Sequence, residues 1–250
     1  MITWGRVTIC RMLLSRIYPR KPKPSRAYTQ TVTQMVQYWQ VLNLDKRQTL
    51  GQESWGEMKD IMMSGTPEAL VAQLRADKSE SWARDRIVIV SDYALTYPEG
   101  MLTPGERDEV EDMYLEGEEG EYDDDDPAPT LYAFAEEWYK AVPVAFGEAG
   151  AGVEYLRNAT KKEYVRSDAV AKVVPADVKA RGAGGLGHAV IVLASWTSEA
   201  EYVGSEAVGT GSWAGDRFEI GGDVGHGWTD ISERVAQRLS HIWDSLSSVS

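Results

Sequence analysis

Three histidines are the residues of this chain best suited to acid–base or metal chemistry, since imidazole titrates near neutral pH and binds transition metals. His188, His226 and His241 show no H-x-x-x-H or H-E-x-x-H spacing, which would place two ligands on one helix face. His226 stands in a Gly-His-Gly-Trp stretch, with Asp223 three residues before it. A carboxylate can orient a neighbouring histidine as a general base. An enzyme that uses His226 and Asp223 is therefore one hypothesis for this protein.

A glycine-rich segment, Gly182 to Gly187, matches the G-x-G-x-x-G pattern of dinucleotide-binding loops. Such a loop needs a strand before it and a helix after it, so that the phosphates meet the helix N-terminus. Here the following residues, His188 to Trp196, have the composition of a strand, and Pro175 interrupts the valines that precede the loop. We therefore interpret the segment as a loop that enters a strand, and not as a cofactor site.

A short block, Ser195-Trp196-Thr197-Ser198-Glu199-Ala200-Glu201-Tyr202-Val203, is followed by Ser205-Glu206-Ala207. It resembles the S-T-E-A-E-Y block of the ribonuclease H domain of copia-type retrotransposons. The resemblance implies a glutamate that helps to hold catalytic magnesium. That family also has an aspartate on an upstream strand in a D-A-D-W context, and this sequence has none there. We therefore assign no metal site to the block.

Other catalytic classes lack their residues in this sequence. The single cysteine is Cys10, so residues 11–250 hold no thiol for a disulfide, a zinc or iron–sulfur site, or a nucleophile. Neither a G-x-S-x-G elbow nor a P-loop is present. We assign no catalytic, cofactor-binding or metal-ligating residue, expect no cofactor, and prefer a non-catalytic role.

The N-terminal segment, residues 1–28, is basic and free of acids. Before Asp45 there is no acidic residue, and the segment holds Arg6, Arg11, Arg16, Arg20, Lys21, Lys23 and Arg26. Arginine-rich, acid-poor and amphipathic segments are typical of mitochondrial presequences. Residues 26–29 resemble the cleavage context of mitochondrial processing peptidase substrates. The alternative is a permanent basic arm that binds anionic lipid, RNA or a neighbouring subunit.

The acids of the chain gather in one tract, residues 106–126, with thirteen acids and one base, Arg107. This tract accounts for nearly all of the net charge of −13. Residues 103–129 form an acidic connector, and because like charges repel we expect its acidic tract to stay extended and residues 118–126 to be solvated. It is either a spacer or a docking strip for a basic partner. It lacks the spaced D-x-D-x-D-G loop that fixes calcium ligands.

Hydrophobic periodicity and capping signals predict an α+β fold. The part before the acidic connector, residues 29–102, is predicted to be helix-rich with one strand at Arg86–Val90, and residues 130–250 are predicted to form a mixed α+β domain. The predicted helices are residues 29–42, a segment around 55–62, a segment from Gly65, Thr103 onward, 130–141, 148–157 and a terminal amphipathic helix capped by Thr229. The predicted strands of the second part are residues 188–196 and 212–220.

These features together favour a structural subunit over an enzyme. Nine tryptophans exceed what a small core needs, so we expect some of them to contact other chains. We expect a non-catalytic, supernumerary subunit of a large mitochondrial assembly such as a respiratory-chain complex or the ATP synthase. It would lie in the matrix or on the matrix face of the inner membrane. No apolar run reaches transmembrane length, and the body shows no basic face for nucleic acid. The alternatives are a capsid-type structural protein with a basic N-terminal arm, or a matrix enzyme.

Overall fold

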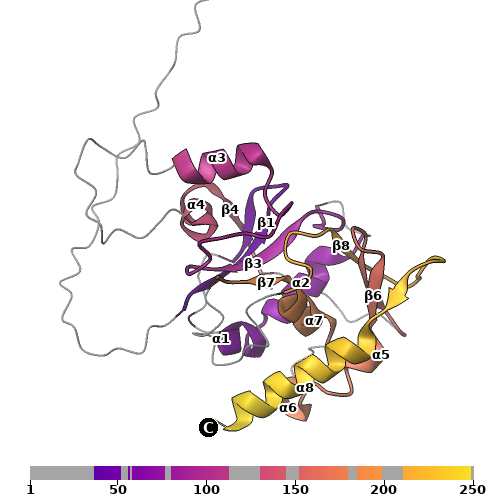
Figure 1. Cartoon of the computed structure of the whole chain (residues 1–250). Helices are drawn as coiled ribbons and strands as arrows, with labels where there is room; N and C mark the ends of the chain where they lie inside the picture. Colours follow the sequence, from indigo (N-terminus) through magenta and orange to yellow (C-terminus); the bar gives the residue numbers. More distant parts are fainter. Residues whose placement is uncertain are drawn as a thin grey trace, which may run out of the picture. The chain divides into compact units, whose positions relative to one another are not determined.

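The computed structural model describes residues 37–51, 56, 58–76, 80–112, 130–144, 152–179, 185–198 and 211–248 (Figure 1). All of these residues belong to one compact unit, Val36–Ser250. The basic N-terminal segment and most of the acidic tract lie outside the described residues, so the predictions made for them are not tested by the structure.

Helices and mixed sheets alternate along the described chain, so the α+β fold class is confirmed. The elements are β1 (Trp39–Asn43), β2 (Gln48–Leu50), α1 (Met58–Met63), α2 (Thr66–Leu74), β3 (Ile87–Ser91), α3 (Pro104–Asp112), α4 (Leu131–Trp138), β4 (Lys140–Val142), β5 (Tyr155–Asn158), β6 (Glu163–Arg166), α5 (Ser167–Val170), α6 (Ala176–Lys179), α7 (Leu186–Ala194), β7 (Ser195–Trp196), β8 (Phe218–Gly221), β9 (Thr229–Asp230) and α8 (Ser232–Ser248).

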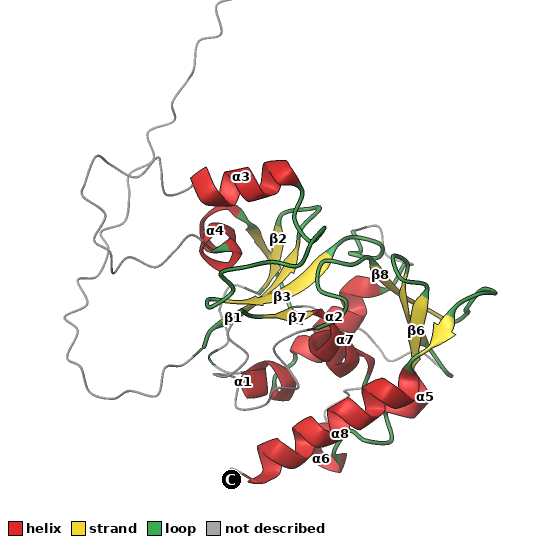
Figure 2. Ribbon diagram, viewed as in Figure 1, coloured by secondary structure: helices red, strands yellow, loops and turns green. Residues whose placement is uncertain are grey.

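The first sheet has five strands in the order β4-β2-β1-β3-β7 (Figure 2). β1 is antiparallel to β2 and β3, whereas β2–β4 and β3–β7 are parallel pairs. The central strands β1 and β3 are buried along their whole length because helices cover both faces. Val88 and Val90 pack with residues of α3 and α4. Ile87 and Ile89 belong instead to the larger apolar cluster that includes α1, α2 and α7.

The second sheet has four strands in the order β8-β5-β6-β9. Alternation along its strands gives it one apolar and one polar face. Leu156 and Val165 are paired across β5 and β6 and are fully buried in the core, against α7 and α8. An isolated antiparallel bridge between Arg86 and Arg217 connects this sheet to the beginning of β3. Residues of both sheets belong to the larger apolar cluster.

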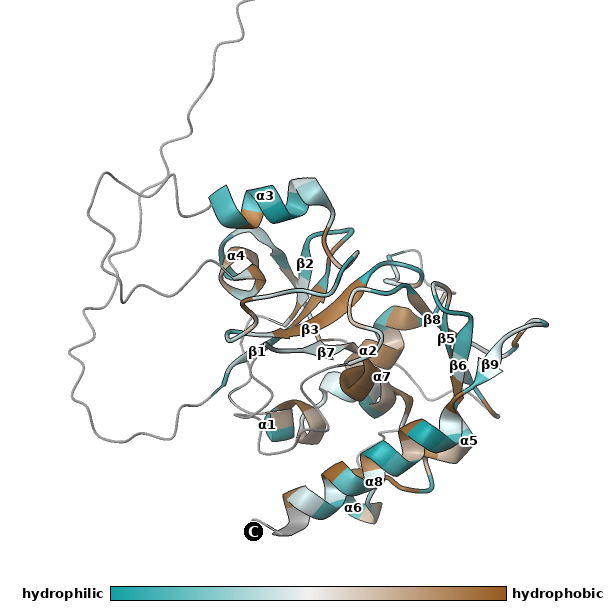
Figure 3. Ribbon diagram, viewed as in Figure 1, coloured by the Kyte–Doolittle hydropathy of each residue, from teal (hydrophilic) through white to brown (hydrophobic). Residues whose placement is uncertain are grey.

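The largest correction to the sequence-based prediction concerns residues 188–196. We predicted a strand, but Leu186–Ala194 is the helix α7, and only Ser195–Trp196 is extended. Every residue of α7 is buried, and Figure 3 shows it among the most hydrophobic parts of the chain. A helix that is apolar on all sides has no helical periodicity to reveal it. Its valines and isoleucine therefore mimicked a buried strand.

Three other predicted helices need correction. The helix predicted for residues 29–42 is wrong at its described end, because Trp39–Asn43 forms β1 and pairs with β3. The helix predicted for residues 148–157 is wrong where it is described, because Tyr155–Asn158 forms β5. The terminal helix begins at Ser232 and not at Thr229, which lies in β9. In each case pairing with a distant strand outweighs the local propensity.

The strong local signals are confirmed. β3 lies at the predicted position, and α2 begins at Thr66 with a proline in its first turn. Thr130 is the N-cap of α4, and its side chain accepts a hydrogen bond from the Ala133 amide at 3.1 Å. The predicted stripe of α8 is buried at Ile231, Val235, Leu239 and Ile242. In the described residues, no helix is both long and apolar enough to cross a membrane.

Candidate interaction surface

His188 is a core residue. It lies on α7, is fully buried, and its Nε2 is 3.0 Å from the Met62 carbonyl oxygen. Its ring packs edge-on against Trp243 of α8, with 5.4 Å between the ring centroids. Burial lowers the pKa of His188 to about 4, so its imidazole is neutral at physiological pH. Its contacts give it a packing role, and it reaches no open site.

His226 and Asp223 line one pocket, of about 460 Å³, together with Tyr155, Tyr164 and Trp228. Both residues are exposed on the loop between β8 and β9. The hydrogen bonds of the described residues do not include one between these two side chains, so the orienting contact of a catalytic pair is missing. Sequence reasoning singled out the two polar residues and did not connect them with the three rings. For Tyr155 and Tyr164 the signal was the alternation of tyrosine and arginine in β5 and β6.

The glycine-rich segment serves helix packing where it is described. Gly185 precedes α7 with φ +91°, a conformation that favours glycine. A β-carbon on Gly187 would lie 2.0 Å from the Pro67 carbonyl oxygen, so α7 and α2 approach each other through this glycine. The element before the segment is the short helix α6, not a strand. The expected strand after the loop is wrong, because the helix α7 follows it.

The remaining chemical candidates gain no support from the described residues. The block that resembles a ribonuclease H motif begins in β7 at Ser195, and its residues 199–207 lie outside the described segments. Within those segments, no three His, Cys, Asp or Glu side chains are arranged to hold a metal ion. His241 is exposed on α8.

The described tryptophans include buried, half-buried and exposed residues. Trp39, Trp82, Trp213 and Trp243 are buried, so much of the apparent surplus fills the core. Trp138 is different, because its side chain is 57% exposed at the end of α4. Among the described tryptophans it is the one that fits the expected role as a contact to another chain.

The position of Trp138 follows from how α4 is held. The Tyr97 hydroxyl accepts a hydrogen bond from the Leu131 amide at 2.5 Å, which adds to the cap at the start of the helix. Leu131 and Phe134 are buried against the five-stranded sheet. Trp138 lies one turn beyond Phe134, with ring centroids 6.4 Å apart, so Phe134 supports one side of an otherwise exposed ring.

Beyond Trp138 the chain enters β4, the outermost strand of the sheet, which pairs with β2 on one side. None of the described strands pairs with its other side. Lys140 is exposed in this strand, and Val144 just after it is 36% exposed. We call Glu136, Glu137, Trp138, Lys140 and Val144 the Trp138 surface. It combines an aromatic anchor with an open strand edge, which can accept hydrogen bonds from an added strand.

Acidic groups surround this surface. Glu136 and Glu137 are exposed on α4. Burial raises the pKa of Asp92 to about 6, against the hydrogen bond from the Tyr38 amide, and the charge of Glu136 adds to the increase. A basic side chain placed here by a partner would relieve this repulsion. The local charge therefore favours a basic partner.

The acidic tract begins in the helix α3, as the capping signal at Thr103 predicted, so its first residues are not extended. Thr103 and Glu106 form a capping box at the start of α3, with the Glu106 carboxylate accepting from the Thr103 amide at 2.8 Å and the Thr103 hydroxyl accepting from the Glu106 amide at 3.3 Å. Glu109 pairs with Arg47 at 2.5 Å. A base of the same chain therefore neutralises Glu109 of α3.

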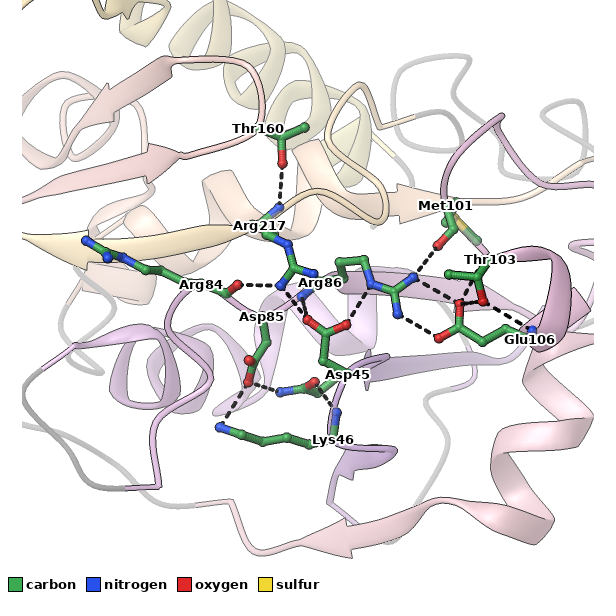
Figure 4. Close-up of polar contacts among 11 residues, drawn as sticks. Asp45, Lys46, Arg84, Asp85, Arg86, Met101, Thr103, Glu106, Thr160 and Arg217 are labelled. Atoms are coloured by element: carbon green, nitrogen blue, oxygen red, sulfur yellow. Dashed lines mark hydrogen bonds and ion pairs between the residues drawn. The ribbon is translucent and has the colours of Figure 1, made fainter.

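Arg86 is the centre of an ion network that joins α3 to both sheets (Figure 4). Its guanidinium donates to both carboxylate oxygens of Glu106, at 3.0 and 2.6 Å, and to Asp45 at 2.7 Å. Arg217 donates to the other oxygen of Asp45 at 2.5 Å. The contact with Glu106, followed by that with Asp45, raises the pKa of Arg86. Burial alone would raise the pKa of Asp45, but the two arginines hold it below its ordinary value.

Comparison of the chain with protein-family models, with curated proteins and with solved structures finds no match.

Proposed function

We propose that this protein is a non-catalytic subunit of a larger mitochondrial assembly and that it docks on its partner through the Trp138 surface. The observation that supports the docking is the exposure of Trp138 beside the open edge of β4. Exposed tryptophans next to a rigid scaffold are the side chains that most often dominate the binding energy of an interface. The mitochondrial location rests on the basic, acid-free residues 1–28 alone, which would act as a presequence.

The charge of the surface specifies the partner further. The acids of α4 are exposed, and some acids of α3 make no ion pair in the described residues. These carboxylates favour a partner that places basic side chains opposite them. The rest of the acidic tract, up to Asp126, follows α3 in the sequence and adds further negative charge. The partner would therefore present an apolar pocket for Trp138 within a basic rim. An inner-membrane complex would bring the chain close to the membrane without inserting it.

The variant Trp138→Ala tests the docking. We expect it to weaken assembly by about 2 kcal/mol or more, roughly 30-fold, because an anchor ring would be lost. The measurement is the migration of the endogenous protein on a native gel of isolated mitochondria, with the variant expressed in its place. The wild type is expected to migrate with a large complex and the variant largely at the mass of the free chain.

Two controls keep this test specific. Trp138→Phe keeps an aromatic ring and should retain part of the assembly, and the urea midpoint of Trp138→Ala should be unchanged because the ring is exposed.

Mass spectrometry of the native N-terminus tests the location, with a start near Thr29 expected after import. Migration of the wild type only at monomer mass would contradict the proposal.

A further inference from the structure

The outer face of the four-stranded sheet carries two tyrosines that face the same space. In the β5–β6 register, Tyr155 pairs with Arg166 and Arg157 pairs with Tyr164. These four side chains point away from the core, because their neighbours Leu156 and Val165 are buried in it. The rings of Tyr155 and Tyr164 meet edge-on, with centroids 5.8 Å apart. The sheet therefore supplies an aromatic floor.

The loop between β8 and β9 forms the wall of a pocket over this floor. Arg157 donates to the Asp223 carbonyl oxygen at 2.7 Å, which fastens the loop to the sheet. Gly227 has φ +82°, a conformation that turns the chain just before Trp228. Trp228 then joins Tyr155 and Tyr164 in lining the pocket of about 460 Å³. Three rings from three separate segments thus surround one open space.

Trp228 already binds a cation of its own chain. The Lys162 ammonium nitrogen is 5.1 Å from the centre of the Trp228 ring, within the range of a cation–π contact. Lys162 is exposed at the turn between β5 and β6, so it can leave the ring at little cost. The contact shows that this ring offers its negative face to an ammonium group.

Among the charged groups around the pocket the arginines are ion-paired, whereas Asp223 and Lys162 make no ion pair within the described residues. Arg157 pairs with Glu219 at 3.2 Å, and Arg166 pairs with Asp168 at 3.1 Å and Asp230 at 3.8 Å. The carboxylate of Asp223, which lines the pocket, makes no ion pair within the described residues. A ligand in the pocket therefore meets three electron-rich rings and the carboxylate of Asp223, and the cation it competes with is the ammonium of Lys162.

We propose that this pocket binds an alkylated ammonium group, either in a small amine or on a methylated lysine side chain, which replaces Lys162 at Trp228. Aromatic rings attract such cations through their quadrupoles, and alkyl groups on nitrogen lower the desolvation cost. The carboxylate of Asp223 adds a direct attraction. An anionic ligand would instead meet the faces of the rings and an acid, both of which repel it.

Titration of the intact chain with choline and with 3,3-dimethylbutan-1-ol tests this proposal, because the two molecules differ mainly by the positive charge. The measurement is the NMR shift of the Trp228 indole and of the loop amides. We expect choline to bind and the neutral alcohol to bind at least about tenfold more weakly. A trimethyllysine peptide distinguishes the source: binding much tighter than that of choline indicates a protein ligand, and equal binding indicates a free amine.

Variants assign the binding to this pocket. Trp228→Leu should reduce choline affinity about tenfold or more, and Asp223→Asn should reduce it less. Lys162→Gln should increase the affinity, because the competing ammonium is gone. The matched control is Trp138→Leu on α4, which removes an exposed tryptophan and should leave choline binding unchanged. Amide spectra of each variant show whether the fold is intact.

Equal binding of choline and its neutral analogue would overturn the proposal, as would the absence of choline binding in both the wild type and Lys162→Gln. The subunit function is tested at Trp138, so the two proposals fail independently.

Discussion

At the scale of single residues, His188 makes stability depend on pH. Burial holds its pKa at about 4 in the folded chain, against an ordinary value of 6.5. Between these values the unfolded chain binds a proton that the folded chain does not. The free energy of unfolding is therefore not reduced by His188 above pH 6.5. Between pH 6.5 and 4 it falls by about 1.4 kcal/mol for each pH unit of acidification.

The variant His188→Gln tests this residue, since an amide can still donate to the Met62 carbonyl without titrating. We expect the free energy of unfolding of the variant, measured by urea titration, to lose this decline between pH 6.5 and 4. The diagnostic quantity is the slope of the variant's free energy of unfolding against pH, and not its value at pH 7. A slope equal to that of the wild type would show that His188 is protonated in the folded chain.

Asp92 acts in the opposite direction and provides the control. Its pKa is raised to about 6 from 3.8, so the folded chain binds the extra proton in this interval, and stability decreases as the pH rises through it. In Asp92→Asn this term is absent, and the acid-induced loss from His188 should become steeper between pH 6 and 4.

At the scale of elements, the crossing of α2 and α7 depends on one glycine. A β-carbon at Gly187 would collide with the backbone of Pro67. We expect Gly187→Ala to destabilise the chain by about 3 kcal/mol, because two buried helices would have to separate. Urea denaturation followed by circular dichroism measures the change.

Gly105→Ala is the matched control for that substitution. Gly105 lies in the first turn of α3, and a β-carbon there meets nothing within 4 Å. Alanine is the better helix former by about 0.5–1 kcal/mol, so the control should be neutral or stabilising. If both variants lost stability equally, the crossing would not be the cause.

The elements also show what the sequence could predict. Thr103 and Thr130 were found as helix starts because a cap and its first turn are local in sequence. α7 was mistaken for a strand because its environment is apolar on all sides, and that environment comes from α2 and α8. β1 was mistaken for the end of a helix because its pairing with β3 involves residues far along the chain.

The pocket and the ion network could not be predicted from the sequence, because each brings together residues that are far apart along the chain. Tyr155, Tyr164 and Trp228 meet only because β6 pairs with both β5 and β9. Asp45 and Arg217 come from opposite ends of the described chain. The sequence gives the residue type of Trp138 but not its exposure, which depends on which side of α4 covers the sheet.

At the scale of the whole molecule, the ion network connects the parts of the fold. Arg86 lies immediately before β3, and its side chain is only 14% exposed. We expect Arg86→Met to destabilise the chain by about 3 kcal/mol, because Asp45 and Glu106 would lose their shared partner in a partly buried place. The measurement is the urea midpoint.

Arg217→Met is the comparison, since this arginine also binds Asp45 but its side chain is 47% exposed. Solvent screens an ion pair of this kind, so the loss should stay below about 1 kcal/mol. Equal losses in the two variants would mean that the network contributes through charge alone and not through its buried position.

The parallel strand pairs of the five-stranded sheet determine when each strand can find its partner during synthesis on the ribosome. β3 cannot find its outer neighbour β7 until Ser195 and Trp196 have left the exit tunnel, and β2 waits in the same way for β4. During that interval both strands have an open edge, and β3 is apolar along nearly its whole length, the form most prone to aggregate. Chaperone binding to stalled chains that end before α7 should therefore be much stronger than binding to chains that contain it.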